Sequence, residues 1–306
     1  MLTVGKEHLP PAEISAGSPI RAMAFTANGE YLVSGDKEAI RMWRVADNQQ
    51  VGVMKAKDVR SVAVSKDGRW IAAGKSWGET TVWDRQTFKE VFTYDSDGHT
   101  VTSVDFSPDS TRLAAASGNR KAYIWDVAAR KMAFPPLEHQ YWVVAAKFTP
   151  RGDRIATATF RDSVRVYDSR NGSLLVVVSA KVTPYYNTGL LWSNGSMLIL
   201  SNNSINRINV TASPTSVTSE WTVDDSNYPC IASPESGELV LYSAGCEIKF
   251  YNTTLGTQSR SPIQLPQDAH SIALSPDGQF LAIGGGDGKL VIKSLVMSTL
   301  SKSPRA

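Results

Sequence analysis

Residues 101–126 read VTSVDFSPDSTRLAAASGNRKAYIWD, and this stretch decides the fold. An apolar run over 101–106 and a second one from 112 flank the tripeptide Pro108–Ser110. Its residues fix φ, accept local hydrogen bonds or tolerate left-handed geometry, which favours a tight turn. A third run ends at the pair Trp125-Asp126. The stretch therefore predicts a strand, a turn, a second strand and then a third strand that ends in Trp-Asp.

The same turn recurs along the whole chain. One pivot residue follows each apolar strand, namely Gly29, Gly68, Ser110, Gly152, Gly195, Ser236 and Gly278. Successive pivots are separated by 39, 42, 42, 43, 41 and 42 residues. A period of roughly 40 to 45 residues that contains short strands is typical of one four-stranded propeller blade.

A second marker runs in phase with the first, about 15 residues after each pivot, where it ends a third strand. It is Trp43-Arg44, Trp83-Asp84, Trp125-Asp126, Tyr167-Asp168, Ile208-Asn209, Tyr251-Asn252 and Lys293-Ser294. On these markers the chain resembles the WD-repeat (WD40) family, whose Trp-Asp pair is intact in the second and third repeats. The resemblance covers essentially the whole chain, although single motifs are degenerate.

The two ends of the chain predict how the ring closes. Residues 2–7 resemble the stretch that follows a Trp-Asp pair in this family, so the following segment His8–Ile14 is expected to be the fourth strand of a blade. The first three strands of that blade are at the other end, around Gly278 and Lys289–Leu295. We therefore expect an all-β, seven-bladed β-propeller with four antiparallel strands per blade, closed by its N-terminal strand. It would be one domain over 1–296, with a flexible tail at 297–306.

Composition excludes several other classes. The chain has 32 basic and 29 acidic side chains in 306 residues, a mild excess that is mixed along the sequence and forms no basic stripe. The densest basic clusters, such as Asn119-Arg120-Lys121, fall near predicted turns and are interpreted as solvated loops. No run approaches the length of a membrane span, and residues 1–14 lack the apolar core of a signal peptide. We expect a cytoplasmic or nuclear location, in which Cys230 and Cys246 stay free thiols.

The sequence contains no catalytic signature. The run Gly284-Gly285-Gly286-Asp287-Gly288-Lys289 lacks the spacing and the following Ser or Thr of a phosphate loop, and it favours a hairpin turn. Four histidines lie in different repeats with no pair at metal-ligand spacing, and two cysteines fall short of a zinc ligand set. We expect no cofactor, no metal and no enzymatic activity.

The WD-repeat resemblance implies a buried hydrogen-bonded set of His, Ser or Thr, Asp and Trp in each blade. His139 and Thr157 fill two of these places in the fourth repeat, where Arg161 and Tyr167 replace the Asp and the Trp. His99 comes near the His place of the third repeat, which has Ala115 in the Ser place and Asn119 in the Asp place, and keeps Trp125. The first repeat has Ser34 and Trp43, but Ala16 and Lys37 in the other two places. No repeat holds the complete set.

Function is therefore argued from a surface, because the fold alone serves many functions. In this family the loops that enter the first strand and those that join the second and third strands gather on one face. The residues so placed are Arg21, Arg60, Trp77, Trp142, Phe160, Arg161, Tyr185, Tyr228 and His270. Aromatic and Arg side chains are enriched at the centres of protein interfaces. We expect Trp77, Trp142 and Phe160 to be exposed, whereas Tyr228 and His270 could equally pack inward.

These residues predict a non-catalytic interaction module or scaffold that binds a peptide or protein on that face, with no membrane partner and with a nucleic acid disfavoured as a partner. Two alternatives stay open. A propeller enzyme would need carboxylates or histidines to converge at the central channel, for example Asp36, Asp58 and Asp268. A nucleic-acid binder would need its basic residues to merge into one stripe. The sequence also leaves open whether the chain is part of a larger protein.

Overall fold

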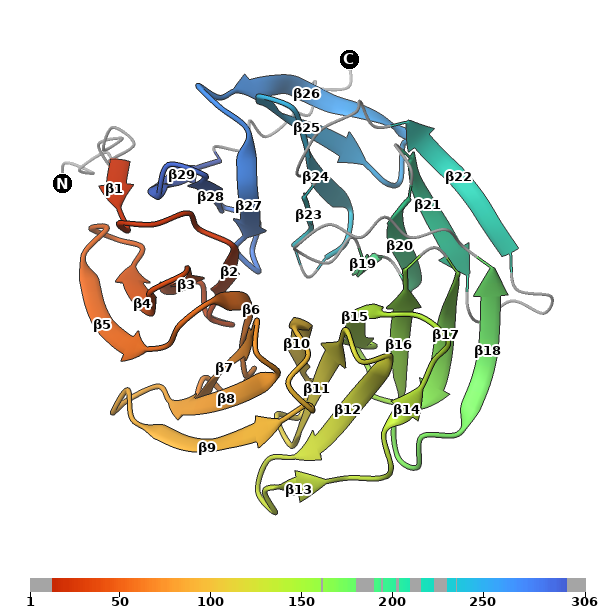
Figure 1. The fold of residues 1–306 in the computed structure, drawn as a ribbon. Helices are drawn as coiled ribbons and strands as arrows, with labels where there is room; N and C mark the ends of the chain where they lie inside the picture. Colours follow the sequence, from red (N-terminus) through yellow and green to blue (C-terminus); the bar gives the residue numbers. More distant parts are fainter. Residues whose placement is uncertain are drawn as a thin grey trace, which may run out of the picture.

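The computed structural model describes residues 13–160, 162–179, 190–193, 195–201, 204–209, 216–222, 230–234 and 236–295. It shows seven antiparallel sheets arranged as a ring, each running from an inner strand to an outer strand (Figure 1). Six sheets have four strands, and that of blade 3 has a fifth because its outer strand is divided. The predicted seven-bladed propeller is confirmed.

The inner strands surround the central channel, and the second strands pair with them. The inner strands are β2 (Ala22–Phe25), β6 (Val59–Val64), β10 (Val101–Phe106), β15 (Val143–Phe148), β19 (Leu190–Ser193), β23 (Ile231–Ala232) and β27 (Ala269–Leu274). The second strands are β3 (Tyr31–Gly35), β7 (Trp70–Lys75), β11 (Arg112–Ser117), β16 (Arg154–Thr159), β20 (Ser196–Ser201), β24 (Leu239–Ala244) and β28 (Phe280–Gly285).

The third strands end at the second sequence marker, and the outer strands form the rim. The third strands are β4 (Ala39–Arg44), β8 (Glu79–Asp84), β12 (Lys121–Asp126), β17 (Ser163–Asp168), β21 (Ser204–Asn209), β25 (Glu247–Asn252) and β29 (Lys289–Ser294). The outer strands are β5 (Gln50–Lys55), β9 (Glu90–Asp95), β13 (Lys131–Met132) with β14 (Leu137–Glu138), β18 (Leu174–Ser179), β22 (Ser216–Thr222), β26 (Thr257–Gln264) and β1 (Glu13–Ser15).

The pivot residues adopt left-handed backbone geometry in six of the seven turns, with φ between 61° at Ser110 and 75° at Gly152. The sixth pivot was wrong by one residue, because the positive φ of 67° belongs to Gly237 and not to Ser236. The amide of Gly237 donates to the carbonyl of Pro234 at 3.0 Å, the same three-residue closure that the pivots of blades 1, 2, 3, 4 and 7 make. Glycine adopts this geometry without the steric cost that a serine side chain carries.

A hydroxyl at the start of the pivot turn locks it in place. In blade 3, Ser107 Oγ donates to the carboxylate of Asp109 at 2.5 Å, and the amide of Arg112 donates back to Ser107 Oγ at 2.9 Å. Four other described turns repeat this pair of bonds, starting from Thr26, Ser65, Thr149 and Ser275. The turn is therefore encoded within about six residues, because its side chains satisfy its own backbone.

The N-terminal strand closes the ring, as predicted. Strand β1 pairs antiparallel with β29, with Ile14 opposite Leu290, and Figure 1 shows the two strands close together. The pairing is extended by a 2.8 Å bond from the amide of Ala16 to the carbonyl of Gly288. Closure pairs the strand edge that β29 would otherwise expose. The other predicted residues of this strand, 8–12, and the tail at 297–306 lie outside the described residues.

Among the residues that the structure describes, the core forms seven apolar clusters, each of which lies between one blade and the next. The cluster between blades 7 and 1 contains Ile20 and Trp43 from one side and Ala282 and Leu290 from the other. Every blade therefore buries both of its sheet faces against neighbours, and no blade has a complete core of its own. This arrangement stabilises the ring as one cooperative unit.

The buried polar set survives in part. In blade 4, His139 Nε2 lies 2.8 Å from Thr157 Oγ1 and 3.2 Å from the hydroxyl of Tyr167, while Arg161 lies outside the described residues. In blade 1, Trp43 Nε1 donates to Ser34 Oγ at 2.8 Å. In blade 3, Trp125 Nε1 is buried without a partner among the described residues. Ala115 in the Ser place explains this loss.

Candidate functional site

The antiparallel order of the strands gives the ring two chemically different faces. The loops that enter the inner strands and those that join the second and third strands open on one side, which we call the loop face. The pivot turns and the loops between third and outer strands open on the other side, which we call the turn face. The first is the face on which the sequence placed its candidate residues.

Backbone hydrogen bonds tie the loops of the loop face to one another. The amide of Ser76 donates to the carbonyl of Asp58 at 3.0 Å, and Thr100 Oγ1 donates to the carbonyl of Ser76 at 2.9 Å. The amide of Gly118 in turn donates to the carbonyl of Thr100 at 2.9 Å. These bonds connect blades 2 and 3, so the side chains carried by these loops are held on a fixed backbone.

A groove lies on the loop face between blades 3 and 4, with a volume of about 360 Å³. Three loops line it, through His99, Gly118, Asn119, Arg120, Gln140, Tyr141 and Trp142. Tyr141 is 48% exposed and Trp142 is 60% exposed, which is unusual for aromatic side chains of this size. The backbone of the two walls is joined where the amide of His139 donates to the carbonyl of Arg120 at 2.9 Å.

The groove leaves one cation available for a partner. Asn119 Nδ2 donates to the hydroxyl of Tyr123 at 2.6 Å, and that hydroxyl donates to the carboxylate of Asp97 at 3.1 Å. Lys121 Nζ lies 3.9 Å from the same carboxylate, so the negative charge of Asp97 is already compensated. The guanidinium of exposed Arg120 has no such partner among the described residues. The groove therefore combines an aromatic wall with an uncompensated positive charge.

The structure divides the predicted surface residues into three groups. Trp77 is 73% exposed, and both it and Trp142 project from the loop face as expected. Phe160 was expected to be exposed but is partly buried, and its amide donates to the carbonyl of Trp142 at 2.9 Å. Arg161, Tyr185 and Tyr228 lie outside the described residues.

The two predicted arginines are engaged within the fold. The guanidinium of Arg21 lies 3.8 Å from the carboxylate of Asp58, and Arg60 Nε donates to Ser76 Oγ at 2.8 Å. Both side chains are partly buried and bridge neighbouring loops. They therefore stabilise the loop face rather than extend from it.

His270 is also partly buried, which was one of its two expected placements. Its imidazole packs over Gly286, where a Cβ atom would lie 2.7 Å from ring atoms of the histidine. Removal of water lowers the pKa of His270, and the nearby guanidinium of Arg21 acts in the same direction. A neutral imidazole packed in this way has a structural role.

Sequence reasoning missed most of the groove. His99 was assigned near the buried polar set, but it is exposed and lines the groove instead. Arg120 was interpreted as a solvated loop residue, and Tyr141 was not singled out. Only their positions in the chain could have indicated them, since each lies in the same kind of loop as Trp77 or as Trp142.

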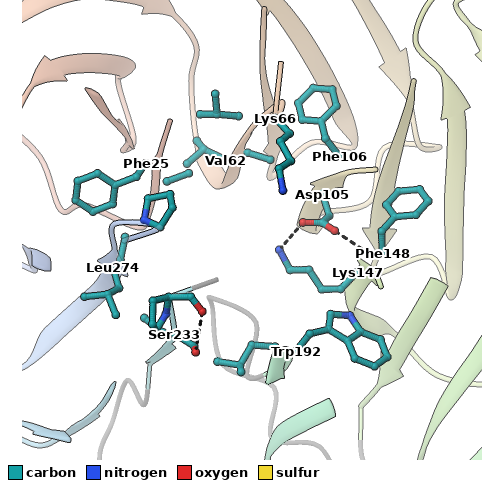
Figure 2. A pocket seen from close by; sticks show the side chains of 18 of the residues that line it. Phe25, Val62, Lys66, Asp105, Phe106, Lys147, Phe148, Trp192, Ser233 and Leu274 are labelled. Atoms are coloured by element: carbon teal, nitrogen blue, oxygen red, sulfur yellow. Dashed lines mark hydrogen bonds and ion pairs between the residues drawn. The ribbon is translucent and has the colours of Figure 1, made fainter. Parts of the chain in front are cut away.

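A second cavity of about 560 Å³ occupies the central channel toward the turn face (Figure 2). The inner strands of all seven blades and the pivot turns of every blade except blade 5 line it, and its wall includes Phe25, Phe106, Phe148 and Trp192. Its central polar feature joins blades 3 and 4. Asp105 accepts from Lys147 Nζ at 3.1 Å and from the amide of Phe148 at 2.8 Å.

Burial raises the pKa of Asp105, although the charge of Lys147 opposes the shift. Each of the two side chains keeps 24% of its surface exposed, so the pair borders the channel and is screened on that side only. The bond to the amide of Phe148 fixes the carboxylate against the neighbouring inner strand. This geometry joins blades and is satisfied within the fold.

The carboxylates proposed for a channel enzyme lie apart, each with a local partner. Asp36 is buried, pairs with Arg41 and accepts the amide of Ala39 at 3.0 Å. Asp58 faces Arg21, and Asp268 Oδ1 lies 3.4 Å from the thiol of Cys246. Within the described residues, no group of three or more His, Cys, Asp and Glu side chains is placed to hold a metal ion.

The cysteines and the hydropathy add two local findings. Neither cysteine forms a disulfide bond, and Cys230 is buried whereas Cys246 is exposed. Burial raises the pKa of the Cys230 thiol to about 12, which keeps it protonated. In the part of the chain that the structure covers, no helix reaches the length and apolar character needed to cross a membrane.

Comparison with known proteins agrees with the repeat pattern. The family described as "WD domain, G-beta repeat" matches at residues 11–44, 48–84, 88–126 and 264–292. The fold is similar to that of the β-propeller domain of Cps50 (Swd1) from Myceliophteria thermophila, with a TM-score of 0.79 and 17% identity. That match covers 94% of this chain and 100% of the other. No curated protein matches the chain in sequence.

Proposed function

Because the chain carries WD40 repeats in a closed seven-bladed propeller, we propose that it is a non-catalytic interaction module that binds a peptide or protein segment on its loop face. WD40 propellers generally serve protein–protein interaction and scaffolding. The observation that supports the loop face is the groove between blades 3 and 4, with exposed Tyr141 and Trp142 beside Arg120. Aromatic and Arg side chains contribute most of the energy at many protein interfaces.

The chemistry of the groove indicates what kind of segment it would bind. Arg120 offers five fixed donors, which suit a carboxylate or another anionic group. The rings of Tyr141 and Trp142 offer apolar area at low cost in conformational entropy. A partner segment that places an acidic side chain next to an aromatic or large aliphatic one would satisfy both. Trp77, on the neighbouring loop of blade 2, would extend the contact.

The test is a selection from a displayed library of random peptides, because the chemistry of the groove predicts the amino-acid composition of the peptides that bind. Peptides selected on the wild-type protein should be enriched in Asp or Glu next to an apolar residue. The affinity of the best synthetic peptide is then measured for the triple variant Trp77→Ala, Arg120→Ala, Trp142→Ala. We expect a loss of at least about a hundredfold, since truncating a central interface residue often costs 2 kcal/mol or more.

The turn face supplies the matched control. Arg151 is an exposed arginine in the pivot turn of blade 4, and Leu255 is 73% exposed in blade 6. The double variant Arg151→Ala, Leu255→Ala should bind the peptide as the wild type does. Selected peptides that lack acidic residues, or a triple variant that binds with unchanged affinity, would reject the loop face as the binding surface.

A further inference from the structure

The outer strand of blade 4 differs chemically from every other outer strand whose side chains the structure describes. Charged residues or proline protect the others, namely Glu13 in β1, Lys55 in β5, Glu90 and Asp95 in β9, Lys131 in β13, Glu138 in β14, and Arg260 with Pro262 in β26. Strand β18 reads LLVVVS and has neither. Charges and proline on an edge strand discourage pairing with another chain, so β18 lacks the usual protection.

The register of the blades shows where this difference lies. Leu174 pairs with Tyr167 of the third strand, just as Gln50 and Glu90 pair with the Trp residues of blades 1 and 2. At the other end, Ser179 replaces Lys55 and Asp95. Compared with β5 and β9, the start of β18 has therefore lost a polar side chain and its end has lost a charged one.

The apolar side chains of β18 fall into two sets. Val176 and Val178 pack inward against the core between blades 4 and 5. Leu174, Leu175 and Val177 are 51%, 47% and 54% exposed. Because β18 is the last strand in the order β15-β16-β17-β18, its outer edge has no strand partner among the described residues, as its place on the rim in Figure 1 shows.

We propose that β18 pairs antiparallel with β18 of a second copy of this chain and forms a twofold dimer. A twofold antiparallel pairing places the start of each strand opposite the end of its copy. Because directly opposed residues of an antiparallel pair lie on the same face, the twofold axis can bring Leu175 opposite Val177 of the copy and Val176 opposite its own counterpart, and β18 contains no charged side chain that would meet a like charge. Strand β18 is its own complement, and this favours a second copy as the occupant.

The chemistry of the pair is simple. The free backbone donors and acceptors of each β18 edge would bond to those of the other copy, so two four-stranded sheets would become one eight-stranded sheet. Leu175 and Val177 of both copies would lie side by side on one surface of that sheet and become partly buried. The inference does not depend on the loop-face proposal, because it uses a different surface.

The test is the oligomeric state of the full chain by sedimentation velocity over a hundredfold range of concentration. The wild type should show a concentration-dependent monomer–dimer equilibrium. Val177→Lys places a charge at the centre of the edge and should raise the dissociation constant by about tenfold or more, because the twofold axis introduces the charge twice. Circular dichroism and the thermal midpoint verify that the variant is folded.

Blade 1 offers a matched control. Val53 of β5 lies opposite Arg41 of β4, just as Val177 of β18 lies opposite Arg165 of β17. The side chain of Val53 is 47% exposed. Val53→Lys should leave the dimer unchanged. Backbone amides in residues 174–179 should also exchange more slowly at high concentration. A wild type that stays monomeric throughout, or a dimer that persists in folded Val177→Lys, overturns the proposal.

Discussion

Exchanging serine and alanine between two blades tests how the buried polar set stabilises the ring. Ser34 and Ala115 hold equivalent places, since each lies two residues beyond the one that pairs with the blade's Trp, which is Leu32 opposite Trp43 and Leu113 opposite Trp125. Only Ser34 provides an oxygen for the indole N–H, at 2.8 Å. Ser34→Ala would convert blade 1 to the state of blade 3, and Ala115→Ser would do the reverse.

The two changes should differ in sign. Ser34→Ala leaves the Nε1–H of Trp43, a residue only 3% exposed, buried without an acceptor, and we expect it to lower the free energy of unfolding by about 1 to 3 kcal/mol. Ala115→Ser supplies an acceptor to Trp125 and should raise it by about 0.5 to 1.5 kcal/mol. The indole of Trp125 is held in place by stacking on Tyr94, with ring centroids 3.9 Å apart.

Urea denaturation followed by tryptophan fluorescence measures both changes as differences in midpoint at a constant m value. The double variant provides a check, since the sites share no described cluster and their effects should add within about 0.5 kcal/mol. A destabilised Ala115→Ser together with a neutral Ser34→Ala would refute the reasoning. Packing around the second strand, and not the indole hydrogen bond, would then decide the stability of these blades.

Three further predictions concern stability. His139→Ala or Thr157→Ala should lower the free energy of unfolding by only about 1 to 2 kcal/mol, measured by the same denaturation, because each change removes the hydrogen bonds of a single buried side chain and the seven apolar clusters remain; loss of folding in either would contradict this. Burial lowers the pKa of His139 from 6.5 to about 4, so the unfolded chain binds the proton first and stability should fall as pH drops from 6.5 to 4. In a His139→Gln variant the free energy of unfolding should fall less steeply with decreasing pH over this window. The pH dependence that remains would include the contribution of His270, whose pKa is also lowered. Gly74→Ala should cost about 1 to 3 kcal/mol, because its Cβ would lie 2.5 Å from Val101 Cγ1 and 2.9 Å from the Val101 carbonyl oxygen; a midpoint equal to that of the wild type would show that blades 2 and 3 can separate at this contact.

Much of the fold was predictable because its signals are local. Each pivot turn is closed by residues within about six positions of one another, and each recurs after one blade. The same locality explains the one error among the pivots. Pro234 stands three residues before the left-handed residue of its turn, one more than the prolines of the other pivot turns, so the positive φ belongs to Gly237 and not to Ser236. A glycine next to the predicted pivot was the available signal.

The candidate site was less predictable because its parts are distant in the chain. The sequence indicated that Trp77 and Trp142 belong to one face, since loop type follows from the strand count. It could not show that Arg120 lies beside Trp142 in one groove, or that Arg21 and Arg60 are engaged with Asp58 and Ser76. Those contacts depend on how neighbouring blades are rotated and packed, which no single repeat specifies.

The sequence by itself determined the number of blades, their strand order and the closure of the ring. These follow from turn chemistry and apolar periodicity, which act between residues close in the chain. Only the tertiary structure decided which side chains remain available to a partner, such as the guanidinium of Arg120 and the exposed edge of β18. The physical reason is that exposure and charge compensation depend on neighbours in space, and in a propeller those neighbours come from another blade.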